Sequence, residues 1–154
     1  SRGRLVSGLV AASVHIACRE MSTTRTLKDI AAASNIKRKQ LAKAYTLLLV
    51  ELDIKVPLAD HTKCIAKVAN KANLSEKTKR LAIRIMDEIK RKDDYILSAG
   101  KNPMALAATI LYLSCLKTGE NKTQVDIAEA AGVTEVTLRN RSKDLKSKLE
   151  ELSN

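Results

Sequence analysis

The chain repeats its own sequence. When Gly3 is placed over Gly100, the two stretches align without a gap as far as Leu48 over Leu145. The residues that match are of structural kinds: helix-capping residues, small packing residues and core leucines. The identical pairs are Gly3/Gly100, Leu9/Leu106, Ala11/Ala108, Cys18/Cys115, Thr26/Thr123, Asp29/Asp126, Ile30/Ile127, Ala31/Ala128, Ala33/Ala130, Leu41/Leu138 and Leu48/Leu145. Such an internal repeat predicts two related units with the same order of secondary-structure elements.

The composition favours an all-α fold. The 154 residues include two prolines and five glycines, with many Ala, Leu and Lys residues that favour helices. Apolar periodicity and capping residues predict helices at Val6–Met21, Leu27–Ser34, Lys37–Leu52, His61–Ala72, from Ser75 to the polar run at Lys90, Met104–Leu116, and in a final pair between Thr123 and Leu149. Val6–Met21 and Met104–Leu116 are apolar on most faces, which predicts buried, central helices.

The second copy has two leading helices between His61 and Lys92 that have no counterpart in the first. We therefore expect residues 1–55 to form the last three helices of one unit and residues 56–154 to form a complete unit of five helices. The chain opens on Ser1 without a Met. We accordingly expect it to be a piece of a longer protein.

The last two predicted helices have the pattern of a helix-turn-helix. Thr123 and Asp126 suit a capping box, Gly132 suits a sharp turn, and Thr134 suits the cap of the second helix. This arrangement leaves the first turns of the second helix facing outward, where such motifs enter the DNA major groove. The outward residues are Thr134, Glu135, Val136, Arg139 and Asn140. A plain helical hairpin is the alternative, because Arg141 occupies a position that is usually a buried aliphatic residue.

The charge of +11 favours an anionic partner, and nucleic acid is the simplest one. A merely lysine-rich surface is the alternative interpretation of the same number. The chain has no Trp or Phe, and its tyrosines are Tyr45, Tyr95 and Tyr112. That scarcity argues against proteins that read single strands by stacking bases on aromatic side chains.

Catalysis and cofactor binding find no support in the sequence. Cys18, Cys64 and Cys115 lie far apart, so no structural zinc site is expected. The histidines, His15 and His61, lack a nucleophile or carboxylate at any familiar spacing. No apolar run is long enough to span a membrane. We expect a protein that is not an enzyme, needs no cofactor or metal, and has no membrane partner.

Three segments resemble a known family: GKNPMALAATILYLSCL, KTQVDIAEAAGVTEVTLRNR and HIACREMSTTRTLKDIA. They are similar to the tandem cyclin-fold core of transcription factor IIB, and the archaeal version, transcription factor B, is the nearer likeness. The resemblance implies two five-helix cyclin repeats that bind the TATA-binding protein on double-stranded promoter DNA. It also implies that the helix-turn-helix of the second repeat reads the element just upstream of the TATA box.

The resemblance further implies an intracellular protein, in the nucleoid of an archaeon or the nucleus of a eukaryote. RNA polymerase would be recruited through other segments of the full-length protein. The same five-helix fold also serves cyclin-like modules that bind a kinase or another protein without reading DNA, so that function is the alternative.

The family's base-reading positions fall on Val136 and Arg139. Arg139 can instead pair within its helix with Glu135, four residues back. The turns at Gly3-Arg4 and Gly100-Lys101 are predicted to precede the central helices, where such loops touch DNA beside the TATA box. The expected contacts to the DNA backbone or the TATA-binding protein are Gly3, Arg4, Arg38, Lys39, Lys101, Thr134, Thr137, Asn140, Arg141 and Lys143.

Overall fold

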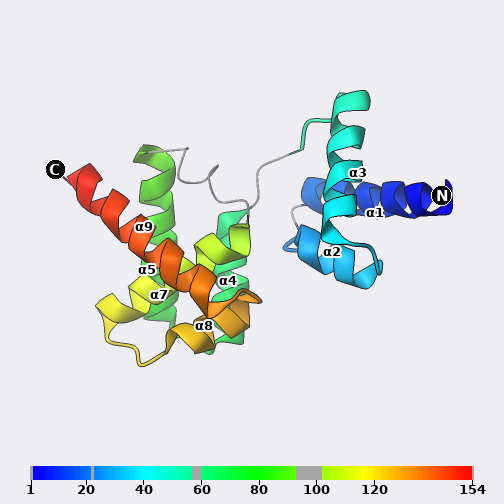
Figure 1. Ribbon diagram of the computed structural model, residues 1–154. Helices are drawn as coiled ribbons and strands as arrows, with labels where there is room; N and C mark the ends of the chain where they lie inside the picture. The colour runs from blue at the N-terminus through cyan, green and yellow to red at the C-terminus, as the bar shows by residue number, and fades with distance from the viewer. Residues whose placement is uncertain (1, 22, 57–59, 93–101, 154) are drawn as a thin grey trace. The chain divides into compact units, whose positions relative to one another are not determined.

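The computed structural model describes residues 2–21, 23–56, 60–92 and 102–153. Its regular secondary structure over these ranges is helical throughout, which confirms the all-α prediction for the part of the chain described (Figure 1). The chain divides into two compact units, Ser1–Asp60 and His61–Asn154. Each unit is described by itself below.

The first unit contains α1 (Arg2–Glu20), α2 (Leu27–Ala33) and α3 (Arg38–Glu51). Thr26 caps α2 in a reciprocal capping box with Asp29, as predicted. The core of this unit is small and consists of Ala11, Ala12, Ile30, Ala31, Leu41 and Ala44. The chain turns between α2 and α3 at Asn35, whose φ of 52° is left-handed; asparagine tolerates this conformation better than most residues.

The second unit contains α4 (His61–Lys71), α5 (Glu76–Lys92), α7 (Pro103–Thr118), α8 (Gln124–Ala131) and α9 (Glu135–Ser153). In this unit α7 packs against α4, α5, α8 and α9, so it is the central helix (Figure 1). Asn102 caps α7, Pro103 occupies its first turn and Gly119 ends it with a left-handed φ of 73°. The prediction of a buried central helix is confirmed here, since its described residues from Met104 to Leu111 are all buried.

The corresponding prediction for α1 is wrong. Val10 and Val14 are 59% and 48% exposed, whereas Ala107 and Leu111, which align with them in the repeat, are both 0% exposed. Among the described elements α1 packs against α2 and α3, while α7 has four neighbouring helices. The apolar face of α1 is therefore covered on one side, although its sequence has the pattern of a helix buried all round.

Replacing Leu138 with Ala should destabilise the protein strongly. This side chain is 0% exposed in the core of the second unit, and such a truncation typically costs about 2–5 kcal/mol because it leaves a cavity. Leu116→Ala is the matched control, since Leu116 is 61% exposed. Urea denaturation followed by circular dichroism should show a clear drop in midpoint for Leu138→Ala and little change for Leu116→Ala. Equal shifts would contradict this assignment of the core.

Candidate nucleic-acid interface

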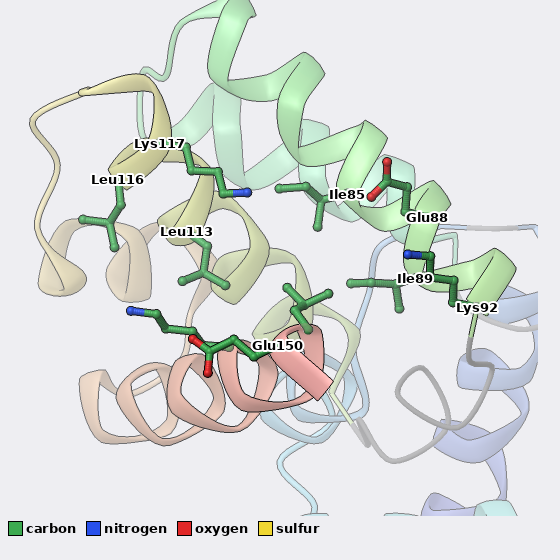
Figure 2. Close-up of a pocket in the computed structure, with 10 residues that line it drawn as sticks. Ile85, Glu88, Ile89, Lys92, Leu113, Leu116, Lys117 and Glu150 are labelled. Atoms are coloured by element: carbon green, nitrogen blue, oxygen red, sulfur yellow. The ribbon is translucent and has the colours of Figure 1, made fainter. Parts of the chain in front are cut away.

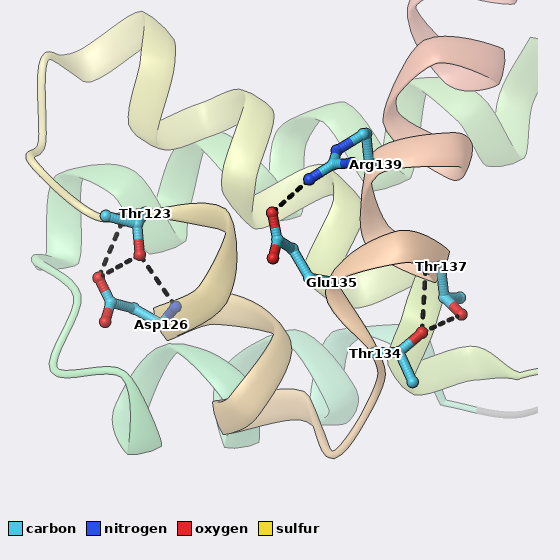
Figure 3. Close-up of polar contacts among 6 residues, drawn as sticks. All are labelled: Thr123, Asp126, Thr134, Glu135, Thr137 and Arg139. Atoms are coloured by element: carbon cyan, nitrogen blue, oxygen red, sulfur yellow. Dashed lines mark hydrogen bonds and ion pairs between the residues drawn. The ribbon is translucent and has the colours of Figure 1, made fainter.

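The two helices α8 and α9 form the predicted helix-turn-helix around a short, fixed turn. At the start of α8, the Thr123 N–H donates to Asp126 Oδ2 at 2.9 Å and the Asp126 N–H donates to Thr123 Oγ1 at 3.1 Å (Figure 3). Hydrogen bonds from Thr123, the backbone one foremost, lower the pKa of Asp126. Gly132 ends α8 with a left-handed φ of 65°, a conformation that glycine adopts without strain. The predicted capping box and turn are confirmed.

The second helix of the motif, α9, is fixed by its cap and by its inner face. Thr134 Oγ1 accepts a hydrogen bond from the Thr137 N–H at 3.2 Å, and the two hydroxyls lie 2.8 Å apart (Figure 3). Leu138 and Leu145 are 0% and 4% exposed in the core. Ala128 of α8 is also buried there, and its small side chain allows α8 and α9 to cross closely. One face of α9 is thus held inside, and the opposite face is left to solvent.

The outward face of α9 carries the two residues expected to read bases. Val136 is 60% exposed, so its methyl groups are accessible on this face. Arg139 is also exposed, and its Nη2 donates to Glu135 Oε1 at 2.5 Å (Figure 3). The side chains of Arg139 and Glu135 are 49% and 40% exposed. The intrahelical pair considered from the sequence is therefore present, and it lies on the same surface as Val136.

The neighbouring positions differ in exposure. Asn140 and Lys143 are exposed, while Thr137 and Arg141 are half-buried. Arg141 stands at the position where a buried aliphatic residue was expected, and α9 keeps its anchorage through Leu138 and Leu145 despite it. These residues, with Thr134, give α9 a polar and basic border around Val136 and Arg139.

Comparison with known proteins identifies the family. The family model described as "Transcription factor TFIIB repeat" matches residues 1–51 and 54–148. The chain belongs to the transcription factor TFIIB repeat family. Repeats of this family have a cyclin-like helical fold, in agreement with the predicted fold class.

Relatives named Transcription initiation factor IIB come from several archaea. Over 148 residues the chain is 43% identical to Transcription initiation factor IIB of Sulfurisphaera tokodaii, covering 96% of this chain and 47% of that protein. It is 42% identical over 144 residues to Transcription initiation factor IIB of Pyrobaculum neutrophilum, covering 94% of this chain and 42% of the relative. The chain thus spans about half the length of the relatives it matches.

In the first TFIIB repeat, the predicted turn at Gly3 and Arg4 is wrong. The helix α1 already begins at Arg2, so both residues lie in its first turn, where they are exposed. The helix was predicted to begin at Val6, and it begins at Arg2 instead. Arg38 and Lys39 open α3 and are exposed. Lys101, with Gly100, lies outside the described residues.

A contact that sequence reasoning missed fixes the loop in front of the helix-turn-helix. Glu120, which follows α7, accepts hydrogen bonds from the Ser75 N–H at 2.8 Å, from Ser75 Oγ at 2.9 Å and from Thr78 Oγ1. This carboxylate therefore joins the start of α5 to the segment that leads into α8. Its partners are distant in the sequence, so no local spacing indicates the contact. Burial acts to raise the pKa of Glu120, but the hydrogen bonds from Thr78 and Ser75 outweigh it and lower that pKa.

This unit also carries a groove lined by α5, α7 and the C-terminal part of α9 (Figure 2). It has a volume of about 770 Å³, with apolar walls that include Ile85, Leu113 and Leu149 and lysine and glutamate side chains at its rim. Neither histidine is among its described lining residues. Over the described part of the chain, no three His, Cys, Asp or Glu side chains gather as a metal site would require. None of the described helices is long and apolar enough to cross a bilayer.

The two histidines lie in cores. His15 of α1 packs edge-on against the Tyr45 ring, with ring centroids 4.9 Å apart. Burial, and next the charge of Arg19, lowers the pKa of His15, so the neutral imidazole is favoured. His61 is 6% exposed at the start of α4. Both positions agree with structural roles.

The Glu120 contact predicts a pH dependence of stability. Because its folded-state pKa lies below the ordinary value of 4.5, its contribution is present above that value and is lost as the pH falls through the folded-state pKa. The parent should be more stable than Glu120→Gln at pH 7, and the two should converge in acid. Thermal unfolding between pH 3 and pH 7 tests this. Glu129→Gln, which removes an exposed carboxylate from α8, controls for net charge; an unchanged gap in acid would contradict the assignment.

Proposed function

We propose that this chain is the promoter-binding core of a general transcription initiation factor. The observation that supports the proposal best is the outward placement of Val136 and Arg139 on the first turns of α9, in a TFIIB repeat that ends in a helix-turn-helix. The names of the relatives support the assignment to initiation. Residues 1–55 would be the last three helices of the first repeat, and residues 56–154 the complete second repeat.

In this function the first turns of α9 enter the major groove just upstream of the TATA box. The guanidinium of Arg139 can donate two hydrogen bonds to O6 and N7 of a guanine, which no other base offers in that arrangement. The exposed methyl groups of Val136 can contact a base edge or the methyl group of a thymine. Readout of double-stranded DNA by these side chains needs no aromatic stacking, in accord with the scarcity of aromatic residues.

Other residues would position the protein without specifying sequence. Around the reading residues, Thr134, Thr137, Asn140, Arg141 and Lys143 can donate to phosphate oxygens. In the first repeat, Arg38 and Lys39 are exposed at the start of α3 and can meet phosphates or the TATA-binding protein. Arg4, Lys101 and the backbone of Gly3 would contact the DNA backbone beside the TATA box. The charge of +11 strengthens all such contacts.

The partners follow from the same proposal. The TATA-binding protein bends DNA sharply through the minor groove, and this chain would bind the bent complex. Because the base contacts come from one repeat, the complex would have a direction along the promoter. RNA polymerase would be a partner of the full-length protein, which would act inside the cell, in the nucleoid of an archaeon or the nucleus of a eukaryote. Catalysis forms no part of this function.

Arg139→Ala should relax the preference at one base pair while the protein stays folded. Loss of a bidentate contact to guanine should remove about 1–3 kcal/mol of discrimination at that position. Gel-shift titrations with the TATA-binding protein would compare duplexes that differ upstream of the TATA box. Arg84→Ala is the matched control, because Arg84 is an exposed arginine of α5, outside the helix-turn-helix. Equal indifference of parent and variant to the upstream sequence would remove the claim of readout.

Lys143→Ala should behave differently from Arg139→Ala. If Lys143 binds a phosphate, its loss should weaken binding to all upstream sequences by a similar factor and lower the slope of log affinity against log salt by about one. Fluorescence anisotropy at several salt concentrations measures both quantities. A selective loss for one upstream sequence would show that Lys143 reads a base instead.

A further inference from the structure

The acidic partner of Arg139 lies on the reading surface itself. Glu135 is the first residue of α9, and its Oε1 accepts the hydrogen bond from Arg139 Nη2 at 2.5 Å (Figure 3). With 40% and 49% of their side chains exposed, Glu135 and Arg139 are an exposed pair one helical turn apart. Such pairs contribute little to the stability of a fold. The core does not require a carboxylate at this place, although the N-terminus of a helix favours a negative charge.

The geometry of the pair leaves Arg139 able to read a base. A guanidinium has five N–H donors in a planar fork, and the bond to Glu135 engages one of its nitrogens. The remaining edge is free to donate to O6 and N7 of guanine. Because Glu135 stands at the N-terminus of α9, where a negative charge is favourable, its carboxylate can hold the arginine in one orientation before DNA arrives.

The negative charge of Glu135 also disfavours contacts of Arg139 with phosphate relative to contacts with a base. An unpaired arginine binds any phosphate, whatever the sequence. When Glu135 lies beside Arg139, a phosphate that approaches the guanidinium also approaches a carboxylate, and the two anions repel. A guanine edge carries no net charge, and the cytosine paired with it presents an amino group that tolerates a nearby acceptor. The pair therefore favours a guanine–cytosine base pair over the backbone.

The first repeat lacks this arrangement, which supports a functional reason for it. In the alignment of the two copies, Arg38 stands at the position of Glu135 and Ala42 at that of Arg139. The first turn of α3 has no acidic residue, whereas the first turn of α9 has Glu135. The acidic partner is thus found in the copy whose helix carries the proposed reading arginine.

We propose that Glu135 is a positioning residue that makes Arg139 selective for guanine over phosphate. This inference rests on the proposed function of α9 as a DNA-reading helix. It assigns Glu135 an action through Arg139 and no base contact of its own.

The test replaces Glu135 with Gln, which removes the charge and keeps the size of the side chain. Discrimination for guanine at the Arg139 position should fall by roughly three- to tenfold, a part of what Arg139 itself supplies. Binding to duplexes of unrelated sequence should become tighter and more dependent on salt. Glu151→Gln, the same change near the other end of α9, should leave discrimination unaltered. Thermal unfolding would verify that all variants remain folded.

A double-mutant cycle separates the proposal from its rivals. In an Arg139→Ala background, Glu135→Gln should cause no further loss of guanine preference. Additive losses would mean that Glu135 contacts a base directly and would overturn the proposal. If Arg139→Ala abolishes the preference but Glu135→Gln preserves it, the positioning role is wrong while the proposed function stands. If the parent itself shows no upstream preference, the proposed function fails first, and the inference with it.

Discussion

The burial of Leu138 and Leu145 determines which face of α9 is exposed to solvent. These two side chains lie in one core with α7, and Ala128 is small enough to let α8 cross α9 closely. Since residues on one side of a helix recur every three or four positions, burial of Leu138 and Leu145 leaves Val136, Arg139 and Asn140 outside. The exposure of an apolar side chain such as Val136 is thus a consequence of where its neighbours are buried.

The two copies show that one sequence pattern can meet two environments. The central helix α7 is enclosed by four others, whereas α1 packs against α2 and α3 among the described elements. The prediction that α1 is buried all round was wrong because an apolar sequence shows which residues suit a core and does not show which helices are present to cover them. Val10 and Val14 remain exposed for that reason.

The helix-turn-helix could be predicted because its capping and turn residues are close in the sequence. Contacts between residues far apart in the sequence could not be predicted. The capping box at Thr123 and the left-handed turn at Gly132 depend on residues within one turn of each other, so the sequence alone predicted them. Glu120, which follows α7, accepts hydrogen bonds from Ser75 and Thr78 at the start of α5. No spacing in the sequence predicts a contact between residues so far apart. The start of α1 was misplaced because Gly3 suggested a turn, whereas one glycine costs a helix only about 1 kcal/mol relative to alanine.

Affinity for DNA and selectivity for its sequence place different demands on charge. These demands relate the net charge of the whole chain to Glu135 at the start of α9. A net charge of +11 attracts any DNA, and that attraction carries no sequence information. Selectivity on such a background requires that the reading residues gain more from the correct base than from a phosphate. In the proposed function the exposed Arg139–Glu135 pair would meet that requirement, because the pair is neutral as a unit and the bond to Glu135 engages one nitrogen of the guanidinium. The first turn of α3 is basic and has no acidic residue, so in the same proposal it would suit a DNA backbone of any sequence. A repeat that duplicates the fold can in this way divide the two tasks between its copies.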